Sequence, residues 1–459
     1  MQTQDIHRRE MKNKLYLFWV IILFIFLSDK AAALDFKELP PFVKGERVLI
    51  FAPHPDDEAI GAGGLIQRAL AAGSQLKVVC YTSGDHNELA FIIYEKRIIF
   101  RKRELVHMGE VRQKETIEAM ASLGLKENDI IFLGYPDFGT MEILTKYWGK
   151  SRPYRNFLNR VSRVPYRNAY SYDAPYVGES ILSDIESIIY DFKPTKIFVS
   201  HPADTNRDHR ALYLFLQVAL WDLEGKIKPP QVFPYIIHVV GWPKPRGYHP
   251  DLELEPPERL SGLWWKLPLS EEEVKAKHDA ISFYKSQIKC NPPYLFTFAR
   301  KNELFGDYPV VKLKAQNTPE ISWQHLKIKE DAQGETEQDQ ISALAYVLSD
   351  KCLSIRLTLK RKINEKFGIS IFLLGYDKEQ DFSQMPKINL VVDAAGLRVK
   401  EKKRTFFIKD ARLHFEDGVL VIGVPLSILG YPHYILSCAR AGLRDLTLDE
   451  MAWHILYLE

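Results

Sequence analysis

Cysteine is scarce in this sequence. Four cysteines are spread over 459 residues and none forms a Cys-x-x-Cys pair, which argues against a disulfide framework and against a zinc site built from thiolates. Cys352 and Cys438 lie in the same C-terminal region, where they either pair in an oxidising compartment or remain as free thiols in buried strands. The sequence leaves both alternatives open.

The sequence also lacks an excess of charge of one sign. Its 62 basic and 59 acidic residues give a formal net charge of +3, so we expect no nucleic-acid partner and no electrostatic attraction to anionic membranes. Residues that can form a hydrophobic core, in contrast, are plentiful, because 46% of the residues are hydrophobic and 12% are aromatic. Together with the chain length, this composition predicts two globular domains rather than one.

The N-terminal apolar run is too short for a typical membrane-spanning helix, which needs about 20 residues. It extends from Leu15 to Leu27, follows a basic segment and precedes Ala31-Ala32-Ala33, the small-residue pattern that a signal peptidase accepts. We therefore predict a signal peptide in residues 1–33, with an uncleaved membrane anchor as the alternative. Either case predicts a secreted or periplasmic protein, and the anchor would associate it with a membrane.

Residues 34–306 alternate short apolar runs with longer segments of helical periodicity. This pattern predicts an α/β domain with a Rossmann-like, mainly parallel sheet and helices on both faces. Two irregular insertions, 137–177 and 241–269, are rich in aromatic residues, and they either wall a site or pack only for stability. The expected strands are 48–52, 76–82, 130–134, 196–200 and 235–240, and the expected helices are 59–72, 111–123, 181–192, 209–223 and 271–287.

The C-terminal part has period-two alternation in place of helical periodicity. Leu353, Ile355 and Leu357 alternate with polar residues, and Asp417-Gly418 lies between two further strand-like runs as in a β-hairpin. We predict an all-β sandwich over residues 337–459, after a linker at 307–336. Trp453 and Tyr434 would either form a platform for binding carbohydrate or belong to its core.

A histidine and three acids follow the first expected strand, in the run Pro53-His54-Pro55-Asp56-Asp57-Glu58. Ligands of open α/β sheets bind beyond the carboxyl ends of the strands, and His54 with Asp57 offers the nitrogen and oxygen that zinc prefers. Gly61-Ala62-Gly63-Gly64 follows, but its spacing is not that of a dinucleotide motif, and three acids would repel a pyrophosphate. Helix capping explains any one acid, but it does not explain the histidine.

A second cluster lies in the equivalent place after a later strand. It extends from His201 to His209 and contains Asp204, Asn206 and Asp208. A lone histidine is usually structural, but two clusters at the ends of two strands can converge on one crevice. The repetition predicts one metal site shared between them.

These motifs resemble the PIG-L / LmbE-like zinc N-deacetylases, over residues 45–305 approximately. The resemblance rests on His-Pro-Asp-Asp-Glu after the first strand and on Asp-x-x-x-Asp-His before a later helix. Supporting features are Arg112-x-x-Glu115-x-x-x-Ala119 with Leu123-Gly124, and the run from His238 to Trp242-Pro243. Enzymes of this family remove acyl groups, usually acetyl, from N-acetylglucosamine-type amino sugars.

The resemblance implies zinc ligands at His54, Asp57 and His209, with Asp56 as general base. Three protein ligands leave the fourth position of zinc open for water, as in catalytic zinc sites. Another divalent metal such as Fe²⁺ is the alternative cofactor. Arg112 and His238 are implied as substrate-binding residues. Their structural alternatives are, for Arg112, a surface salt bridge with Glu115 or its neighbours and, for His238, an ordinary strand histidine.

One position departs from the family pattern. Many members have a histidine three residues before the last ligand, and Asn206 stands there in this sequence. We assign Asn206 to the catalytic site as a hydrogen-bond donor to an oxyanion, although it supplies no proton at neutral pH. Asp56 would then shuttle the proton, or His201, His238 or another histidine would replace the missing one, or the activity would be weak.

The sequence therefore predicts a zinc-dependent N-deacetylase that acts on an amino sugar in a glycan, glycolipid or glycoside. Two alternatives remain at this level. One is a carbohydrate-binding protein without turnover on a deacetylase scaffold, which Asn206 keeps open. The other is a zinc amidase that acts on a non-sugar amide.

Overall fold

The structure is a computed structural model that describes residues 35–86, 102–258, 260, 262–316, 323–326, 340–349, 351–401, 404–407, 412–443 and 446–459. The predicted signal peptide or anchor lies outside these residues. Within them, no helix is both long enough and apolar enough to cross a membrane. All four cysteines are free, so the predicted alternative of a Cys352–Cys438 disulfide is wrong.

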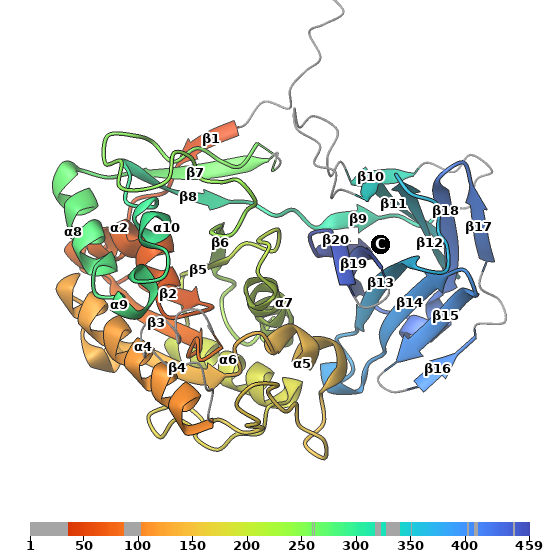
Figure 1. Cartoon of the computed structure of the whole chain (residues 1–459), viewed down its shortest axis with the longest axis horizontal. Helices are drawn as coiled ribbons and strands as arrows, with labels where there is room; N and C mark the ends of the chain where they lie inside the picture. The colour runs from red at the N-terminus through yellow and green to blue at the C-terminus, as the bar shows by residue number, and fades with distance from the viewer. Residues whose placement is uncertain are drawn as a thin grey trace, which may run out of the picture.

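A five-stranded parallel sheet lies at the centre of the N-terminal part, in the order β4-β3-β2-β5-β6 (Figure 1). The chain builds β2, β3 and β4 outwards in one direction and then returns to add β5 and β6 on the other side of β2. The order therefore reverses between β2 and β5, which is where ligands bind in open α/β sheets. The strands are β2 Arg47–Ala52, β3 Gln75–Thr82, β4 Ile130–Tyr135, β5 Lys196–Ser200 and β6 Gln231–Tyr235.

Helices cover both faces of this sheet, as the sequence predicted. Alternate residues of a strand point to opposite faces: Val48 and Ile50 pack with α2, α4 and α8, whereas Leu49 and Phe51 pack with α5, α6 and α7. The helices are α2 Asp57–Ala71, α4 Lys102–Ser122, α5 Thr140–Lys146, α6 Gly178–Phe192, α7 Arg207–Asp222, α8 Glu271–Ile281, α9 Lys285–Ile288 and α10 Pro292–Phe296, with the 3₁₀ turn η1 Glu127–Asp129. A small sheet, β1 Asp35–Glu38, β7 Leu263–Pro268 and β8 Asn302–Gly306, completes what we call the α/β unit (β1 to β8).

Two expected elements end or break earlier than the sequence predicted, and the helix expected at 111–123 begins earlier, at Lys102. The strand expected at 235–240 is wrong, because β6 ends at Tyr235 and the following backbone turns away to donate hydrogen bonds from Ile237 and His238 to Asp204. The helix expected at 271–287 is interrupted between α8 and α9, where Tyr284 has a non-helical backbone and its hydroxyl donates a hydrogen bond to Glu58. In both places a contact with the candidate site overrides the local pattern.

The C-terminal part is a two-sheet β structure, here called the β unit (β9 to β21), as Figure 1 shows. One sheet has the order β10-β11-β12-β18-β17, and the other has the order β16-β15-β14-β13-β19-β21-β9, with β20 paired to β19. Apolar side chains of both sheets form one core between them, so the predicted sandwich is confirmed as a fold. Its strands are β9 Val311–Leu313, β10 Gln324–Leu326, β11 Ile341–Ser349, β12 Cys352–Leu359, β13 Phe367–Tyr376, β14 Lys387–Asp393, β15 Gly396–Glu401, β16 Arg404–Phe406, β17 Arg412–Glu416, β18 Val419–Pro425, β19 Tyr434–Leu443, β20 Leu446–Glu450 and β21 His454–Leu458, with 3₁₀ turns η2 Phe382–Gln384 and η3 Leu426–Leu429.

The two units share a packed core. Trp148 and Phe215 of the α/β unit belong to the same buried cluster as Phe372, Phe382 and Trp453 of the β unit. Trp453 is only 1% exposed, so its predicted alternative role as a sugar platform is wrong and its role in the core is confirmed. β9 lies within the predicted linker and pairs with β21, while the predicted domain boundaries themselves stay predictions.

Candidate metal centre and active site

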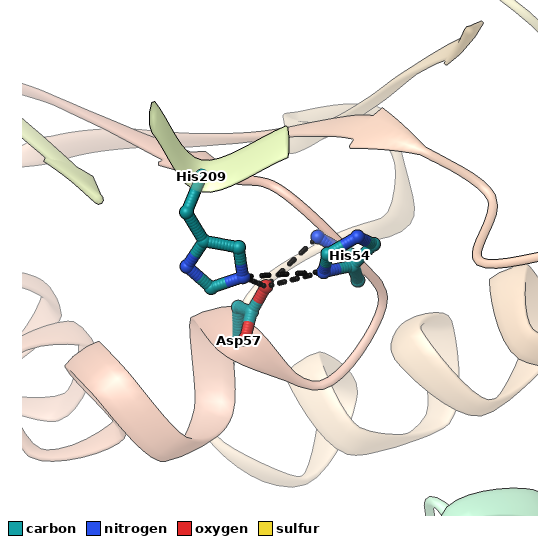
Figure 2. A group of neighbouring side chains, drawn as sticks. All are labelled: His54, Asp57 and His209. Atoms are coloured by element: carbon teal, nitrogen blue, oxygen red, sulfur yellow. Dashed lines mark hydrogen bonds and ion pairs between the residues drawn. The ribbon is translucent and has the colours of Figure 1, made fainter. Parts of the chain in front are cut away.

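Two loops at the switch point of the sheet bring the candidate site together. β2 and β5 are adjacent and parallel, so the segments that follow them leave the sheet at the same edge. The loop after β2 carries His54 and leads into α2, which begins at Asp57, while the loop after β5 leads into α7, which carries His209. Figure 2 shows the three side chains pointing towards one another, with Asp57 at the start of a helix.

The three side chains present their donor atoms to one another as a compact triangle. Oδ2 of Asp57 lies 3.2 Å from Nδ1 of His54 and 3.1 Å from Nε2 of His209, and the two nitrogens are 3.2 Å apart. Tetrahedral zinc with bonds of 2.0–2.1 Å separates its ligand atoms by about 3.3–3.4 Å. The three buried donors therefore fit a zinc-sized ion with little movement, and they leave a fourth coordination position for another ligand.

Each candidate histidine ligand also has a carboxylate behind it. Nδ1 of His209 lies 3.1 Å from Oδ2 of Asp204, and Nε2 of His54 lies 3.1 Å from Oδ1 of Asp137. Histidines that bind metal commonly donate their second N–H to a carboxylate, which fixes the ring and its tautomer. Both rings are thus oriented with one nitrogen towards the triangle.

A second group of potential ligands shares His54. It joins Nε2 of His54 to Asp137 and Asp208. Asp208 already accepts hydrogen bonds from the backbone N–H groups of Phe138 (2.6 Å) and Thr140 (3.1 Å). We therefore interpret Asp137 and Asp208 as groups that orient His54 and the loop before α5, rather than as a second metal site.

Electrostatics hold the triangle in an ionised form. Burial acts to lower the pKa of His209, but the charges of Asp204 and Asp57 raise it to about 9. Burial likewise opposes the shift at His54, whose pKa Asp137 raises well above its usual value. The pKa of Asp57 is well below its usual range because the attraction of His209 and His54 outweighs burial. A cation that binds here must displace the protons of the histidines.

Asp56 lies beside the triangle without belonging to it. Its backbone has φ of 126° at the start of α2, and its N–H donates a hydrogen bond of 3.1 Å to Glu58. Oδ2 of Asp56 lies 3.3 Å from Nη2 of Arg112. Burial, together with the nearby charge of Asp57 and against that of Arg112, raises the pKa of Asp56 to about 8. This second carboxyl group is available for proton transfer.

Arg112 is buried behind the site loop. Its guanidinium donates hydrogen bonds to the carbonyls of Pro55 (2.6 Å) and Gly84 (2.9 Å) besides its contact with Asp56. The predicted alternative of a surface salt bridge with Glu115 is wrong, since Arg112 is 3% exposed and Glu115 accepts hydrogen bonds from Ser286 instead. The structure shows Arg112 positioning Asp56, and its predicted contact with substrate stays a prediction.

The remaining predicted residues lie close to His209 in different ways. The ring of His238 meets that of His209 edge-on at 4.7 Å, and its Nδ1 lies 2.9 Å from the hydroxyl of Tyr294. Burial lowers the pKa of His238 to about 4, so this ring is neutral at pH 7. Asn206 is the N-cap of α7, where its side-chain oxygen accepts a hydrogen bond of 2.9 Å from Asp208 N–H. Its catalytic role stays a prediction.

His201, the other histidine considered as a proton donor, makes its contacts with Ala203 and Trp264. It is buried, its Nδ1 accepts a hydrogen bond from Ala203 N–H, and its ring stacks on Trp264. Burial lowers its pKa to about 4. These contacts make His201 a structural residue.

The carboxylates behind the histidines were missed from the sequence. Asp137 follows the end of β4, and Asp204 follows the end of β5. The rule that singled out His54, namely a polar residue just beyond the carboxyl end of a parallel strand, applies to both. Asp204 even lies within the cluster that was recognised, but its role depends on the path of the loop.

The glycine run in α2 serves packing. A Cβ at Gly61 would lie 2.7 Å from the ring of Tyr235, and one at Gly63 would lie 3.0 Å from Lys277. α2 has a break at Ala62, after which the N–H groups of Gly64 and Leu65 donate to the buried carboxylate of Glu303. The glycines thus let α2 approach its neighbours closely.

The fold and the site together define an α/β domain with a candidate metal centre at its switch point. Residues 49–220 match the family model PIG-L, described as GlcNAc-PI de-N-acetylase. Residues 49–220 therefore form a PIG-L family domain, within the longer range 45–305 over which the sequence shows the resemblance.

Two curated relatives are similar to parts of this chain at low sequence identity. The chain is 24% identical over 269 residues to a glucosamine-6-phosphate deaminase-like protein of Bacteroides thetaiotaomicron, covering 54% of this chain and 36% of the relative. It is 33% identical over 90 residues to a probable N-acetyl-α-D-glucosaminyl L-malate deacetylase of Bacillus cereus, covering 20% of this chain and 37% of the relative. The chain thus spans little more than a third of the length of these curated relatives.

A solved structure of N,N'-diacetylchitobiose deacetylase from Pyrococcus horikoshii is also similar. It is 19% identical, with a TM-score of 0.35, and the match covers 57% of this chain and 82% of that chain. The strand order described above, rather than this similarity, defines the fold.

Proposed function

We propose that this protein is a zinc-dependent hydrolase that removes the N-acetyl group from an N-acetylglucosamine-type amino sugar. The observation that carries the proposal is the contrast between two adjacent carboxyl groups. Asp57 is held within the triangle of donors, whereas Asp56 points outside it and is held by Arg112. Hydrolysis at a metal centre needs this division between a ligand and a free base.

A divalent cation bound by His54, Asp57 and His209 would make a water molecule more acidic and would polarise an amide carbonyl. The residues of the chain supply the remaining functions. In its ionised form, which a cation bound nearby would favour, Asp56, 13% exposed at its side chain, accepts the proton of the attacking water. Its raised pKa lets it hold that proton and return it to the departing amine.

Arg112 and Glu58 keep Asp56 in place during this exchange. Arg112 contacts the carboxyl group of Asp56, and Glu58 accepts a hydrogen bond from its backbone N–H. Glu58 is itself held by the hydroxyl of Tyr284. Because the base is held on both sides, little reorganisation is needed for proton transfer.

The amino-sugar substrate is proposed from the relatives. The family description names a GlcNAc-PI de-N-acetylase, and the Bacillus cereus relative is named for an N-acetyl-glucosaminyl malate. Amino sugars acetylated at nitrogen are the substrate that these names share. We therefore propose this class, without choosing between a glycan, a glycolipid and a glycoside.

Release of acetate from N-acetylglucosamine and its oligomers tests the proposal. We expect zinc-loaded wild type to release acetate, and Asp56→Asn to lower kcat by about 10²–10⁴-fold with unchanged zinc content. Binding of the sugars without acetate release would support a carbohydrate-binding protein instead. Release from N-acetylated amino acids but not from the sugars would support the amidase alternative. Equal rates for wild type and Asp56→Asn would refute the assigned base.

A further inference from the structure

A buried carboxylate of the β unit faces the helix that carries His209. Glu450, the last residue of β20, has a side chain that is only 11% exposed, and three guanidinium groups surround it. Nε of Arg440 lies 3.0 Å away, Nη1 of Arg210 lies 3.3 Å away, and Nε of Arg207 lies 3.8 Å away. Arg207 and Arg210 belong to the first turn of α7, so Glu450 ties the β unit to this end of the helix.

Arg210 connects this ion pair to the loop before α7. Its side chain is 5% exposed, and its Nη1 donates a hydrogen bond of 3.1 Å to the carbonyl of Met451 in the β unit. Its Nε donates a hydrogen bond to the carbonyl of Asp204 in the α/β unit. One rigid planar group therefore bridges the two units, a geometry that lysine, with a single ammonium group, does not reproduce.

Asp204 in turn determines the position of His209. Its Oδ2 lies 3.1 Å from Nδ1 of His209 and accepts hydrogen bonds from the N–H groups of Ile237 (3.1 Å) and His238 (2.9 Å). The contacts form a continuous chain from Glu450 through Arg210 and Asp204 to the candidate metal ligand. Of the residues in this chain of contacts, only His209 belongs to the triangle of donors.

We propose that Glu450 and Arg210 are positioning residues for the metal centre. The β unit would then contribute to the geometry of the metal site in the α/β unit. Glu450 forms an ion pair with the guanidinium of Arg210, and Arg210 donates a hydrogen bond to the backbone carbonyl of Asp204. The side chain of Asp204 in turn contacts the ring of His209. The inference rests on the metal centre of the proposed function. It goes beyond that function by assigning the β unit a role in metal binding.

The interface offers a matched control at the other end of α7. The hydroxyl of Tyr376 in the β unit donates a hydrogen bond of 2.8 Å to Asp222, the last residue of α7. Asp222 lies about 20 Å along the helix from His209, at 1.5 Å per residue. Tyr376→Phe therefore removes a contact between the same two units without touching the chain that leads to His209.

The test compares zinc affinity in full-length wild type, Glu450→Gln and Tyr376→Phe by competition with a chelator. Loss of a group that contacts a metal ligand directly typically weakens metal binding about 10–100-fold, and because Glu450 acts through Arg210 and Asp204 we expect a loss at the lower end of that range, about tenfold, in Glu450→Gln. We expect Tyr376→Phe to bind zinc as wild type does, and Glu450→Asp, which keeps the charge, to recover part of the affinity. A thermal unfolding scan of each variant shows that the folded protein is being compared.

Two results would overturn the inference: wild-type zinc affinity in folded Glu450→Gln, or the same loss in Tyr376→Phe as in Glu450→Gln. If Glu450→Gln does not fold, Arg210→Lys decides, because it keeps a positive charge beside Glu450 but loses the bridge to Asp204, and wild-type affinity there also overturns the inference. Failure of the proposed function gives a different result, since wild type itself would then bind no zinc.

Discussion

At the scale of residues, two neighbouring aspartates have opposite electrostatic environments. Asp57 has a pKa well below its usual range because His209 and His54 outweigh its burial, whereas burial raises the pKa of Asp56 to about 8. The difference arises from the start of α2, where φ of 126° at Asp56 turns the two carboxyl groups towards different partners. Both residues are aspartates, so it is their different partners that distinguish them.

The protonation of the histidines predicts how metal affinity depends on pH. His209 has a pKa of about 9 against an ordinary value of 6.5, so in the metal-free fold it contributes stability below pH 6.5 that is lost as the pH rises through about 9. Zinc must displace that proton, so its apparent affinity should rise about tenfold per pH unit for each proton displaced over this interval. Chelator competition at several pH values measures the slope, and a flat profile would contradict the assigned ligand.

Asn206 provides a test of helix capping at the start of α7. Replacing an N-cap asparagine by alanine costs about 1 kcal/mol of stability, whereas aspartate caps equally well. We therefore expect Asn206→Ala to lower the free energy of unfolding by about that amount and Asn206→Asp to leave it unchanged, as measured by urea denaturation. Equal stability of Asn206→Ala and wild type would show that the hydrogen bond to Asp208 N–H has no capping value.

The sequence predicted these site residues unevenly, for physical reasons. His54 and Asp57 were found because they lie just beyond a strand that is apolar enough to recognise, and His209 because it ends the cluster that follows another such strand. The family resemblance then gave the ligands their roles. Asp137 and Asp204 were missed because their roles depend on how two loops fold back towards the histidines. The burial of Arg112 was missed because an arginine in an amphipathic helix is usually exposed.

At the scale of elements, α2 is shaped by close packing. Gly61 faces the ring of Tyr235, whose hydroxyl donates a hydrogen bond of 2.8 Å to the carbonyl of Phe51 and so fixes the ring. Glu303 accepts the N–H groups that the break at Ala62 leaves free. The helix that begins at Asp57 is therefore held between β6 and β8, and its position fixes that of the metal ligand.

This packing predicts the cost of a single methyl group in α2. Gly61→Ala gains up to about 1 kcal/mol in helix propensity, but a Cβ 2.7 Å from the Tyr235 ring forces overpacking that costs about 1–3 kcal/mol. We expect a net loss of stability in thermal or urea unfolding. Gly149→Ala is the control, because a Cβ there meets no atom within 4 Å. A more stable Gly61→Ala protein would disprove the close contact.

Elements were predictable where local pattern and tertiary contacts agree. β2, with an apolar run buried on both faces, and the hairpin of β17 and β18 lie where the sequence placed them. The strand expected at 235–240 failed because Asp204 draws the backbone after Tyr235 out of the sheet. Such a contact involves residues more than thirty positions apart, and apolar periodicity contains no information about it.

At the scale of the whole molecule, the α/β unit and the β unit are joined by a common core. The ring of Phe382 in the β unit meets that of Trp148 in the α/β unit edge-on at 4.9 Å, and both are buried. The sequence predicted two domains with a linker between them. It did not predict this joint core, because nothing local in either segment reveals its partner.

The joint core predicts cooperative behaviour. Phe382→Ala should lower the free energy of unfolding by about 3–5 kcal/mol, as is usual for a buried phenylalanine, and the two units should still unfold in one transition. Tyr431→Ala, at a side chain that is 65% exposed, should change stability by less than about 0.5 kcal/mol. Calorimetry measures both variants, and two separate transitions in wild type would contradict a shared core.

The metal content of the purified protein tests the central claim most directly. Wild type, His54→Ala and His209→Ala are loaded with zinc, dialysed and analysed for metal by mass spectrometry, with folding checked by circular dichroism. The triangle of His54, Asp57 and His209 predicts about one zinc ion per chain in wild type and its loss in both variants. Zinc retained by the variants at the level of wild type, or no zinc in wild type, would contradict the account.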